Sequence, residues 1–332
     1  MLSSLQIHIG VRRAPGGHGM QSSRREFLNN AAACAAGAYL LPGRNVMGAD
    51  LTSRPLGLQL YTVGADFDKD PFGTLQKVAA VGYREVELSP VSKVPLKDLK
   101  KGLLDTGLRN PSGHYQLPDL QGHLDERIGT AKELGEQYMI VSVPWVADPS
   151  RVQTGSKNQM EGFLAMLNGL TLDDWKWNAE QFNKVGEQVK KAGLQLGYHN
   201  HNFEFRKIGD TTGYDEFLRL TDPELVALEL DCGWISVAGL DPVTYLKKYP
   251  SRYRLLHIKD FKKGFTPSTH LGPAADAAVP TELGRGAVDY SRILAAAPEN
   301  VLLFVEQEPP FKEMPALEAI KVDFDYLHNL KV

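Results

Sequence analysis

Histidine and acidic side chains recur at the ends of short apolar segments in this chain of 332 residues. The segments close on His199-Asn200-His201, Glu229-Leu230-Asp231, His257-Ile258-Lys259-Asp260 and Glu306-Gln307-Glu308. Burying several carboxylates together is unfavourable unless a positive charge neutralises them. Mixed oxygen and nitrogen ligands suit Mn²⁺, Co²⁺, Zn²⁺ or Fe²⁺, and no thiolate is needed. We therefore predict a divalent-metal site built from His199, Asp231, His257 and Glu306.

The alternation of side chains along a strand limits the choice of ligands without completing it. Residues two apart lie on the same face of a strand, so Glu229 shares a face with Asp231 and His257 shares one with Lys259. The pattern alone leaves open which member of each pair binds. Cys232 follows Asp231 and faces the other way, and we expect it to be a small core residue.

The elements that must position these side chains alternate between apolar runs and amphipathic segments. The expected strands are 56–61, 83–88, 108–115, 138–143, 194–201, 225–231, 253–260 and 301–306. The expected helices are 71–81, 96–106, 120–134, 172–192, 214–220, 242–248, 291–296 and 314–330. Asp70-Pro71 reads as a helix start, and Gly82, Gly107 and Gly193 follow helix ends. Eight such alternations predict one (β/α)₈ TIM barrel, in which all the strand ends meet at one mouth.

A doubly wound open sheet is the rival fold, but no G-x-G-x-x-G follows the first expected strand, where that fold would place it. One long connection, 145–170, interrupts the alternation. In a barrel it lies on the catalytic face, and the sequence leaves open whether it is a lid or a surface decoration.

The first 49 residues read as an export signal. Ser23-Arg24-Arg25-Glu26-Phe27-Leu28 matches the twin-arginine motif, and an Ala-rich stretch (31–41) with Pro42-Gly43 follows it. Met20 precedes the motif and is a possible true start. Cys34 lacks the preceding Leu of a lipid-attachment site, so no membrane anchor is expected. We predict a periplasmic protein whose catalytic domain spans residues 50–332.

Composition narrows the function classes. The formal net charge of −3 gives no sign of a nucleic-acid partner, which would need clustered Lys and Arg. No run of about 18 apolar residues follows residue 50, so no membrane span is expected there. Once the signal is removed, Cys232 is a lone thiol and cannot build a disulfide framework.

A set of short motifs resembles the sugar phosphate isomerase/epimerase family, whose xylose isomerase-like barrels include inosose dehydratases, hydroxypyruvate isomerases and keto-sugar 3-epimerases. The motifs are Gly57-Leu58-Gln59-Leu60-Tyr61-Thr62-Val63, Gly82-Tyr83-Arg84-Glu85-Val86-Glu87-Leu88, Gly197-Tyr198-His199-Asn200-His201, Leu230-Asp231-Cys232-Gly233-Trp234, His257-Ile258-Lys259-Asp260, Gly284-Arg285-Gly286 and Val305-Glu306-Gln307-Glu308. They cover nearly the whole body in family order. The chain is most similar to the branch that carries export signals.

The resemblance implies a metal held by Asp231, His257 and Glu306, with the fourth position falling on His199. The commoner pattern has Glu at that position, so His201 and Glu204 remain alternative fourth ligands. Many relatives have Asp-Thr-Gly-His where this chain has Asp231-Cys232-Gly233-Trp234. Trp234 therefore places an aromatic wall where a polar partner is usual.

The chemistry that such a site supports is deprotonation beside a carbonyl, with an enediolate intermediate stabilised by the metal. Proton return then gives an isomer or an epimer, and loss of a β-leaving group gives a dehydratase or lyase. Glu306 is the expected ligand and base, with Glu204 or His201 as its partner. The expected substrate-binding residues are Gln59, Glu87, His114, Trp234, Lys259 and Arg285. A salt bridge to a neighbouring carboxylate is the other interpretation of Lys259.

Two other function classes share this pattern. A metal phosphodiesterase of the AP-endonuclease type uses the same barrel, although near-neutral charge and export argue against it. A non-catalytic sugar-binding barrel would bind its ligand without a metal. The expected substrate is a carbohydrate, namely a free keto-sugar, an inosose or a 3-keto-glycoside. The sequence allows a homodimer and specifies neither the metal nor the stereochemistry.

Overall fold

The computed structural model describes residues 54–88, 94–151, 159–272, 278–311 and 313–332. Contacts divide the chain into units 1–47 and 48–332, and the fold below is that of the second unit. The predicted twin-arginine motif, Met20 and Cys34 lie outside the described residues.

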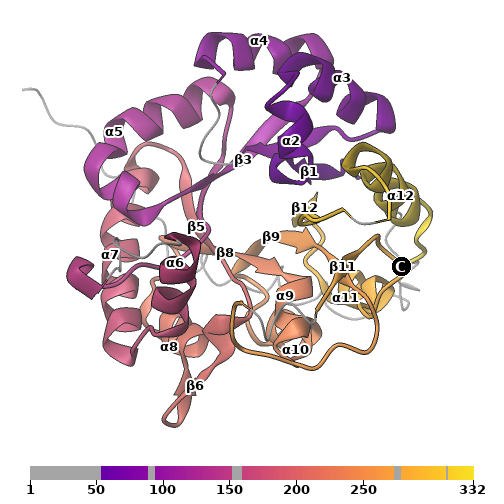
Figure 1. The fold of residues 1–332 in the computed structure, drawn as a ribbon. Helices are drawn as coiled ribbons and strands as arrows, with labels where there is room; N and C mark the ends of the chain where they lie inside the picture. The colour runs from indigo at the N-terminus through magenta and orange to yellow at the C-terminus, as the bar shows by residue number, and fades with distance from the viewer. Residues whose placement is uncertain (1–53, 89–93, 152–158, 273–277, 312) are drawn as a thin grey trace, which may run out of the picture. The chain divides into compact units, whose positions relative to one another are not determined.

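Eight parallel strands close into a barrel, which confirms the predicted TIM-barrel fold (Figure 1). They are β1 (Gly57–Gln59), β2 (Glu85–Leu88), β3 (Arg109–Tyr115), β4 (Tyr138–Val141), β5 (Gln195–His199), β8 (Val226–Asp231), β9 (Tyr253–Ile258) and β12 (Leu302–Val305). Strand β1 pairs with both β2 and β12, so the sheet has no edge, and this excludes the doubly wound alternative. Two short antiparallel pairs lie outside the barrel: β6 (Lys207–Ile208) with β7 (Thr211–Thr212), and β10 (Asp260–Phe261) with β11 (Pro280–Thr281).

Helices surround the strands (Figure 1). They are α2 (Gly64–Phe67), α3 (Pro71–Val81), α4 (Leu96–Thr106), α5 (Leu117–Leu134), α6 (Gln159–Asn168), α7 (Leu172–Lys191), α8 (Gly213–Leu220), α9 (Cys232–Val237), α10 (Pro242–Lys248), α11 (Tyr290–Ala296) and α12 (Ala316–Asn329), with 3-10 turns η2 (Leu60–Val63), η3 (Pro149–Arg151) and η4 (Phe203–Phe205). Helix α3 begins and ends where the sequence predicts. The Asp70 side chain accepts a hydrogen bond from the Gly73 N–H at its start, and Gly82 has a positive φ of 129° at its end. A residue with a Cβ is strained in that conformation, which is why glycine ends this helix.

The interior of the barrel is apolar at one end and polar at the other. Ile140, Leu255 and Phe304 are fully buried and form a hydrophobic cluster of their own. Gly57 makes room for this layer, because a Cβ at that position would lie 2.4 Å from the Phe304 ring. Phe304 pairs in register with His257 of β9, whose ring lies 6.3 Å from the Phe304 ring between centroids. The apolar layer therefore meets the imidazoles and carboxylates that approach the mouth.

The short helix α2 was not expected, and two further helices also depart from the sequence prediction. Helix α6 lies inside the long connection 145–170, and Asn168 at its end exchanges two side-chain hydrogen bonds with the backbone of Leu271. The connection is thus tied to the loop that follows β10. Helix α9 begins directly after β8, and the Asp231 side chain caps it by accepting the Trp234 N–H at 2.7 Å. Its six residues are too few to show a helical period, so no sequence pattern marked it.

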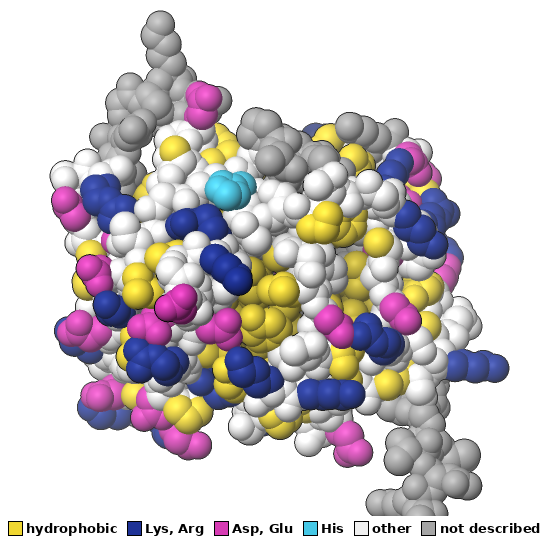
Figure 2. Space-filling model, turned by 90° about the horizontal axis from the view of Figure 1, so that it is seen from below, with side chains coloured by type: hydrophobic (Ala, Val, Ile, Leu, Met, Phe, Trp, Pro, Cys, Tyr) yellow, Lys and Arg dark blue, Asp and Glu magenta, His cyan; other side chains and the backbone are white. Residues whose placement is uncertain are grey.

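The surface of one side shows Lys and Arg interspersed with Asp and Glu around a central group of hydrophobic side chains (Figure 2). Charges of both signs are mixed over this face, in contrast to the one-signed patch that typifies nucleic-acid binding. Among the described residues, every helix is too short or too polar to cross a membrane.

Candidate functional site

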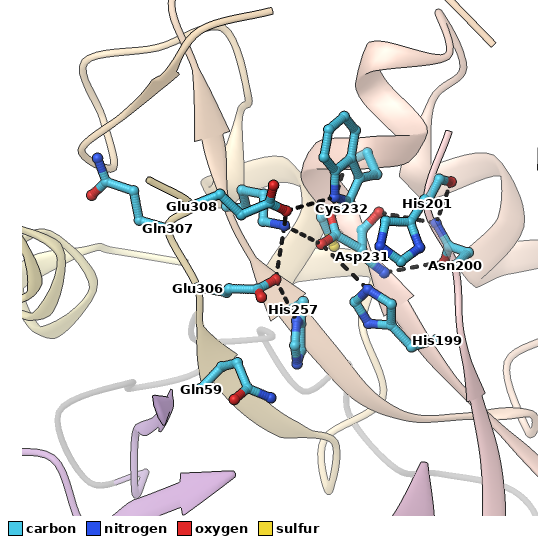
Figure 3. Close-up of polar contacts among 12 residues, drawn as sticks. Gln59, His199, Asn200, His201, Asp231, Cys232, His257, Glu306, Gln307 and Glu308 are labelled. Carbon is cyan, nitrogen blue, oxygen red and sulfur yellow. Dashed lines mark hydrogen bonds and ion pairs between the residues drawn. The ribbon is translucent and has the colours of Figure 1, made fainter. Parts of the chain in front are cut away.

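The ends of four adjacent strands bring together the four residues that the sequence predicts as metal ligands. Ligand atoms of His199, Asp231, His257 and Glu306 all lie within 4.8 Å of one another, and all four residues are buried. We call these four residues the outer cluster. Figure 3 shows their side chains converging from β5, β8, β9 and the residue after β12.

The donor atoms of the outer cluster fit a cation. His199 places Nδ1 3.0 Å from Glu229 Oε2, which leaves Nε2 facing Asp231 Oδ2 at 3.9 Å. Asp231 uses Oδ1 to cap α9, whereas its buried Oδ2 accepts no hydrogen bond within the described part of the chain. A buried oxygen with no hydrogen bond is unfavourable unless a cation satisfies it. These donors are the kinds that a divalent transition metal or zinc prefers.

His257 joins the outer cluster to a second group of buried polar residues. Its Nδ1 lies 3.0 Å from Glu306 Oε2, and its Nε2 lies 2.7 Å from Glu87 Oε2. An imidazole that binds a metal through one nitrogen usually donates its other N–H to a carboxylate, which fixes its orientation. His199, with Nδ1 on Glu229, has the same arrangement.

The second group consists of Glu87, His114 and Glu229, and we call it the inner cluster. His114 Nε2 lies 3.0 Å from both Glu87 Oε2 and Glu229 Oε2. Glu87 also accepts hydrogen bonds from Gln59 Nε2, at 2.8 Å, and from the Ser112 hydroxyl. Glu87, His114 and Gln59 were predicted to bind substrate, and the structure places them in hydrogen bonds with one another or with their neighbours.

The imidazoles of His114 and His257 balance the carboxylates of the inner cluster. Burial alone would raise the pKa of Glu87, but His114 and His257 hold it well below its usual value. Burial alone would lower the pKa of His114, but Glu87 and Glu229 raise it to about 10. Burial and the nearby Glu87 charge raise the pKa of Glu229 to about 7. A buried His114 imidazolium beside the Glu87 carboxylate is therefore the favoured state of this cluster.

The two histidines of the outer cluster differ in charge. Burial, with the nearby His257 charge, lowers the pKa of His199 well below its usual value, so His199 is neutral. A neutral imidazole is the form that binds a metal. Burial would also lower the pKa of His257, but Glu229 and Glu87 raise it well above the usual value. A bound cation must therefore displace a proton from His257.

Lys259 lies against the outer cluster. Its ammonium is 2.7 Å from Glu306 Oε2, 3.2 Å from Asp231 Oδ2 and 2.6 Å from Glu308 Oε1, and its side chain is 1% exposed. Burial would lower the pKa of Lys259, but Asp231 and Glu306 raise it well above the usual value. In return, Lys259 and then His257 hold the pKa of Glu306 well below its usual value, against the effect of burial. Of the two interpretations of Lys259, the structure shows the salt bridge, and a role in holding substrate stays a prediction.

Three further predicted residues, His201, Glu204 and Trp234, lie near the outer cluster. The His201 ring lies 5.0 Å from the His199 ring and 5.9 Å from Trp234, between centroids, with its side chain 20% exposed. Glu204 is fully buried, and its Oε1 accepts from the His201 N–H and the Tyr198 hydroxyl, both at 2.9 Å. Trp234 faces the Lys259 ammonium at 5.1 Å from the ring centroid.

Arg285 is bound elsewhere in the structure. Its guanidinium lies 3.1 Å from Glu282 Oε2 and is about half exposed. Among the described residues, no ion pair joins it to the outer cluster. Its predicted contact with substrate stays a prediction.

Sequence reasoning missed two residues. Tyr61, in η2 directly after β1, is 51% exposed, and its pKa is raised by burial and by the charges of Glu308 and Glu306. It is therefore an aromatic side chain at the mouth, and its place at the end of the first strand was the available signal. Ser112 lies in mid-strand on β3, and no sequence signal marked it as a partner of Glu87.

Comparison with known proteins matches residues 75–322 to the family described as xylose isomerase-like TIM barrel. An inosose dehydratase from Clostridium tetani is 30% identical over 166 residues, which cover 46% of this chain and 53% of the relative. Such matches span about half the length of the first relatives. A longer match, to the inosose dehydratase of Mesomycoplasma hyopneumoniae, is 27% identical and covers 81% of this chain and 90% of the relative.

Solved structures share the fold. A sugar phosphate isomerase/epimerase from Parabacteroides distasonis has a TM-score of 0.66 and 26% identity, over 83% of this chain and 98% of that one. Two similar barrels contain metal: one has a bound zinc atom (TM-score 0.57, 14% identity, 84% of this chain and 99% of that one), and one from Mycobacterium smegmatis is in complex with magnesium (TM-score 0.56, 15% identity, 84% and 98%). At that identity, these two show the fold alone.

Proposed function

The chain belongs to the xylose isomerase-like TIM barrel family, and we propose that it is a divalent-metal-dependent enzyme that moves a proton beside a carbonyl of a sugar-like substrate. The reaction is an isomerisation, an epimerisation or an elimination. The observation that carries the proposal is the outer cluster, in which four buried ligand groups from four strands converge within 4.8 Å. The relatives named as inosose dehydratases support the choice of a sugar-like substrate.

His199, Asp231, His257 and Glu306 would hold the cation, with His199 through Nε2 and Asp231 through Oδ2, the atoms that face each other across the cluster. When bound, a divalent cation polarises a carbonyl or hydroxyl oxygen of the substrate and so acidifies the adjacent C–H. Glu229 accepts a hydrogen bond from His199 Nδ1 and Glu87 accepts one from His257 Nε2, and these bonds would orient the two imidazoles toward a cation.

Glu306 and His201 are the proposed proton-transfer groups. Glu306 is deprotonated, since Lys259 and His257 lower its pKa, and it can accept a proton from carbon. Figure 3 shows His201 on the other side of Asp231 from Glu306. His201 Nδ1 is buried without a hydrogen-bond partner in the described residues, and Glu204 holds the His201 backbone. Two groups on opposite sides allow a proton to leave from one face of a substrate and return to the other.

Trp234 and Tyr61 supply apolar walls that a sugar ring can pack against. The substrate we propose is an uncharged keto-sugar, inosose or 3-keto-glycoside. This choice rests on the predicted export signal, because phosphorylated intermediates are confined to the cytoplasm. We propose a periplasmic location on the same ground.

The first test is elemental analysis of the purified protein beside Asp231→Ala and His257→Ala. We expect near-stoichiometric Mn, Co, Zn or Fe in the wild type and background levels in both variants. Arg285→Ala, which removes a salt bridge to Glu282, serves as a folded control that should keep the metal. Absence of metal from the wild type after reconstitution with each ion would contradict the proposed mechanism and favour a sugar-binding barrel.

The second test follows proton transfer directly. The metal-loaded protein is incubated in D₂O with keto-sugars, inososes and 3-keto-glycosides, and NMR detects deuterium beside the carbonyl. We expect exchange that His201→Ala and Glu306→Gln each reduce by roughly 10²-fold or more, the usual contribution of a positioned acid or base. Exchange that is unchanged in both variants would assign the proton transfer to other residues.

A further inference from the structure

The Lys259 ammonium lies where a metal ion would need its own space. It contacts Glu306 Oε2 and Asp231 Oδ2, at 2.7 and 3.2 Å, and both residues belong to the outer cluster. The Asp231 oxygen is the same one that accepts no hydrogen bond. One positive charge thus already satisfies two of the four groups that would hold a divalent cation.

We propose that Lys259 is an internal counter-ion that neutralises the outer cluster while no metal is bound and moves toward Glu308 and Trp234 when a metal enters, so that it sets the affinity of the site. The inference rests on the proposed function, because it concerns the same four ligands. It differs from a role in substrate binding, since it predicts effects in the absence of any substrate.

Electrostatics supplies the reason for competition. A unit positive charge within about 4 Å of a carboxylate interacts strongly with it in a buried site, where water screens little. A divalent ion that binds the same oxygens would meet the ammonium at a similar distance, and like charges so close oppose binding. The ammonium must therefore move away or weaken the metal.

The structure provides a place for the ammonium to go. Glu308 Oε1 already lies 2.6 Å from Lys259 Nζ, and Glu308 is not part of the outer cluster. The Trp234 ring presents its face to the ammonium at 5.1 Å, and Trp234 Nε1 donates to Glu308 Oε1 at 3.1 Å. An aromatic face attracts a cation, so Glu308 and Trp234 together form a second position for the charge. The flexible four-carbon stem of lysine allows a short movement between the two positions.

The experiment measures Mn²⁺ binding by calorimetry, with MnCl₂ as the probe, and the melting midpoint of the metal-free protein. Lys259→Met keeps the length of the stem and removes the charge. We expect its Mn²⁺ Kd to fall at least about tenfold, equivalent to about 1.4 kcal/mol. We also expect its metal-free midpoint to fall, because the carboxylates lose their counter-ion, and its midpoint to rise more on Mn²⁺ addition than that of the wild type.

Lys262→Met is the matched control, because Lys262 is half exposed and pairs with Glu313 rather than with the outer cluster. It should leave both quantities unchanged. A Lys259→Met protein that binds Mn²⁺ no more tightly than the wild type overturns the inference while leaving the metal site intact. Binding by the variant alone supports the inference, and no binding by either protein overturns both this inference and the proposed function.

A second variant keeps the test decisive if Lys259→Met does not fold. Glu308→Gln removes the second position of the ammonium, so Mn²⁺ affinity should fall about tenfold, whereas the exposed Glu313→Gln should leave it unchanged. A Glu308→Gln protein that binds Mn²⁺ as tightly as the wild type overturns the proposed movement. Where Lys259→Met folds, the same Glu308→Gln change in that background should have a much smaller effect, which a double-mutant cycle measures. An equal effect in both backgrounds would show that Glu308 acts on the metal only through its own charge, independently of Lys259. That result would overturn the proposed movement.

Discussion

The inner and outer clusters are built from the same kinds of residue but differ in which side chains supply their positive charge. In the inner cluster, Glu87 accepts from four side chains, and His114 bridges Glu87 to Glu229. In the outer cluster, Asp231 Oδ2 accepts no hydrogen bond among the described residues, and Lys259 supplies its nearest positive charge. The carboxylates of the inner cluster are thus neutralised by the imidazoles of His114 and His257, although Glu229 Oε1 also accepts no hydrogen bond in the described residues, whereas those of the outer cluster face Lys259.

This difference assigns distinct roles to residues of identical type. Glu229 and Asp231 are two positions apart on β8, yet Glu229 orients His199 and Asp231 faces the site. We therefore expect changes in the inner cluster to act mainly through stability and through the orientation of ligands. Changes near the mouth act through binding.

The largest expected effect is that of His114→Gln on the stability of the metal-free protein. The pKa of His114 is raised from its ordinary 6.5 to about 10 by Glu87 and Glu229. Its stabilisation is therefore fully present below about pH 6.5 and is lost as pH rises through about 10. We expect the variant to lose up to about 5 kcal/mol of unfolding free energy at pH 6 and much less near pH 10.

Urea unfolding in the presence of a chelator, at pH 6, 8 and 10, measures this difference. His123→Gln is the control, since His123 is exposed and pairs with Asp119 on the surface of α5. A stability gap for His114→Gln that does not narrow with rising pH would show that His114 is not the counter-charge of the inner cluster.

A smaller effect is expected for Glu229→Gln on metal affinity. Residues that orient metal-bound histidines typically contribute about 10- to 100-fold to affinity. We expect such a loss, measured by competition with a chelator, while one metal per chain is still bound at saturation. Glu85→Gln is the matched control: Glu85 is a buried glutamate on β2 that pairs with Arg109, away from both clusters. A loss of stoichiometry in Glu229→Gln would instead make Glu229 a direct ligand.

The smallest effect is expected for Tyr61→Ala, which tests whether the mouth is a binding surface. Loss of an aromatic contact with a sugar ring corresponds to about 0.5–1.5 kcal/mol, or roughly a 2- to 10-fold rise in KM. Metal content and unfolding free energy should not change, because Tyr61 is 51% exposed. Phe72→Ala, at a 43% exposed position on α3, should leave KM unchanged. An equal effect of the two changes would remove Tyr61 from the substrate site.

Much of the fold was predictable from local patterns. The predicted bounds of α3, α4 and α10 agree with the structure, because proline starts, glycine ends and apolar periodicity are all local signals. Cys232 is buried in the core, as predicted, although it is the first residue of α9 rather than part of a strand. Helices α2, α6 and α9 were missed, since α6 lies in a connection interpreted as irregular and the other two are shorter than two turns.

The sequence predicted which residues form the candidate site but not how those residues contact one another. The four predicted ligands do converge, because the carboxyl ends of parallel barrel strands all open on one mouth. The prediction grouped Glu87 and His114 with the substrate-binding residues. Their hydrogen bonds with His257 and Glu229 were hidden, because these pairs are separated by 170 and 115 positions in the chain.

The sequence by itself determined that this chain closes into a barrel and that its polar residues gather at one end. Both follow from local signals, namely the apolar runs of the strands and the residues that start and end the helices. Only the tertiary structure decided which residue of each alternating pair faces the mouth and which lies beneath it. It alone placed the Lys259 ammonium between Asp231 and Glu306. The physical reason is that the tilt and stagger of barrel strands set the height at which neighbouring side chains meet, and no local pattern encodes that height.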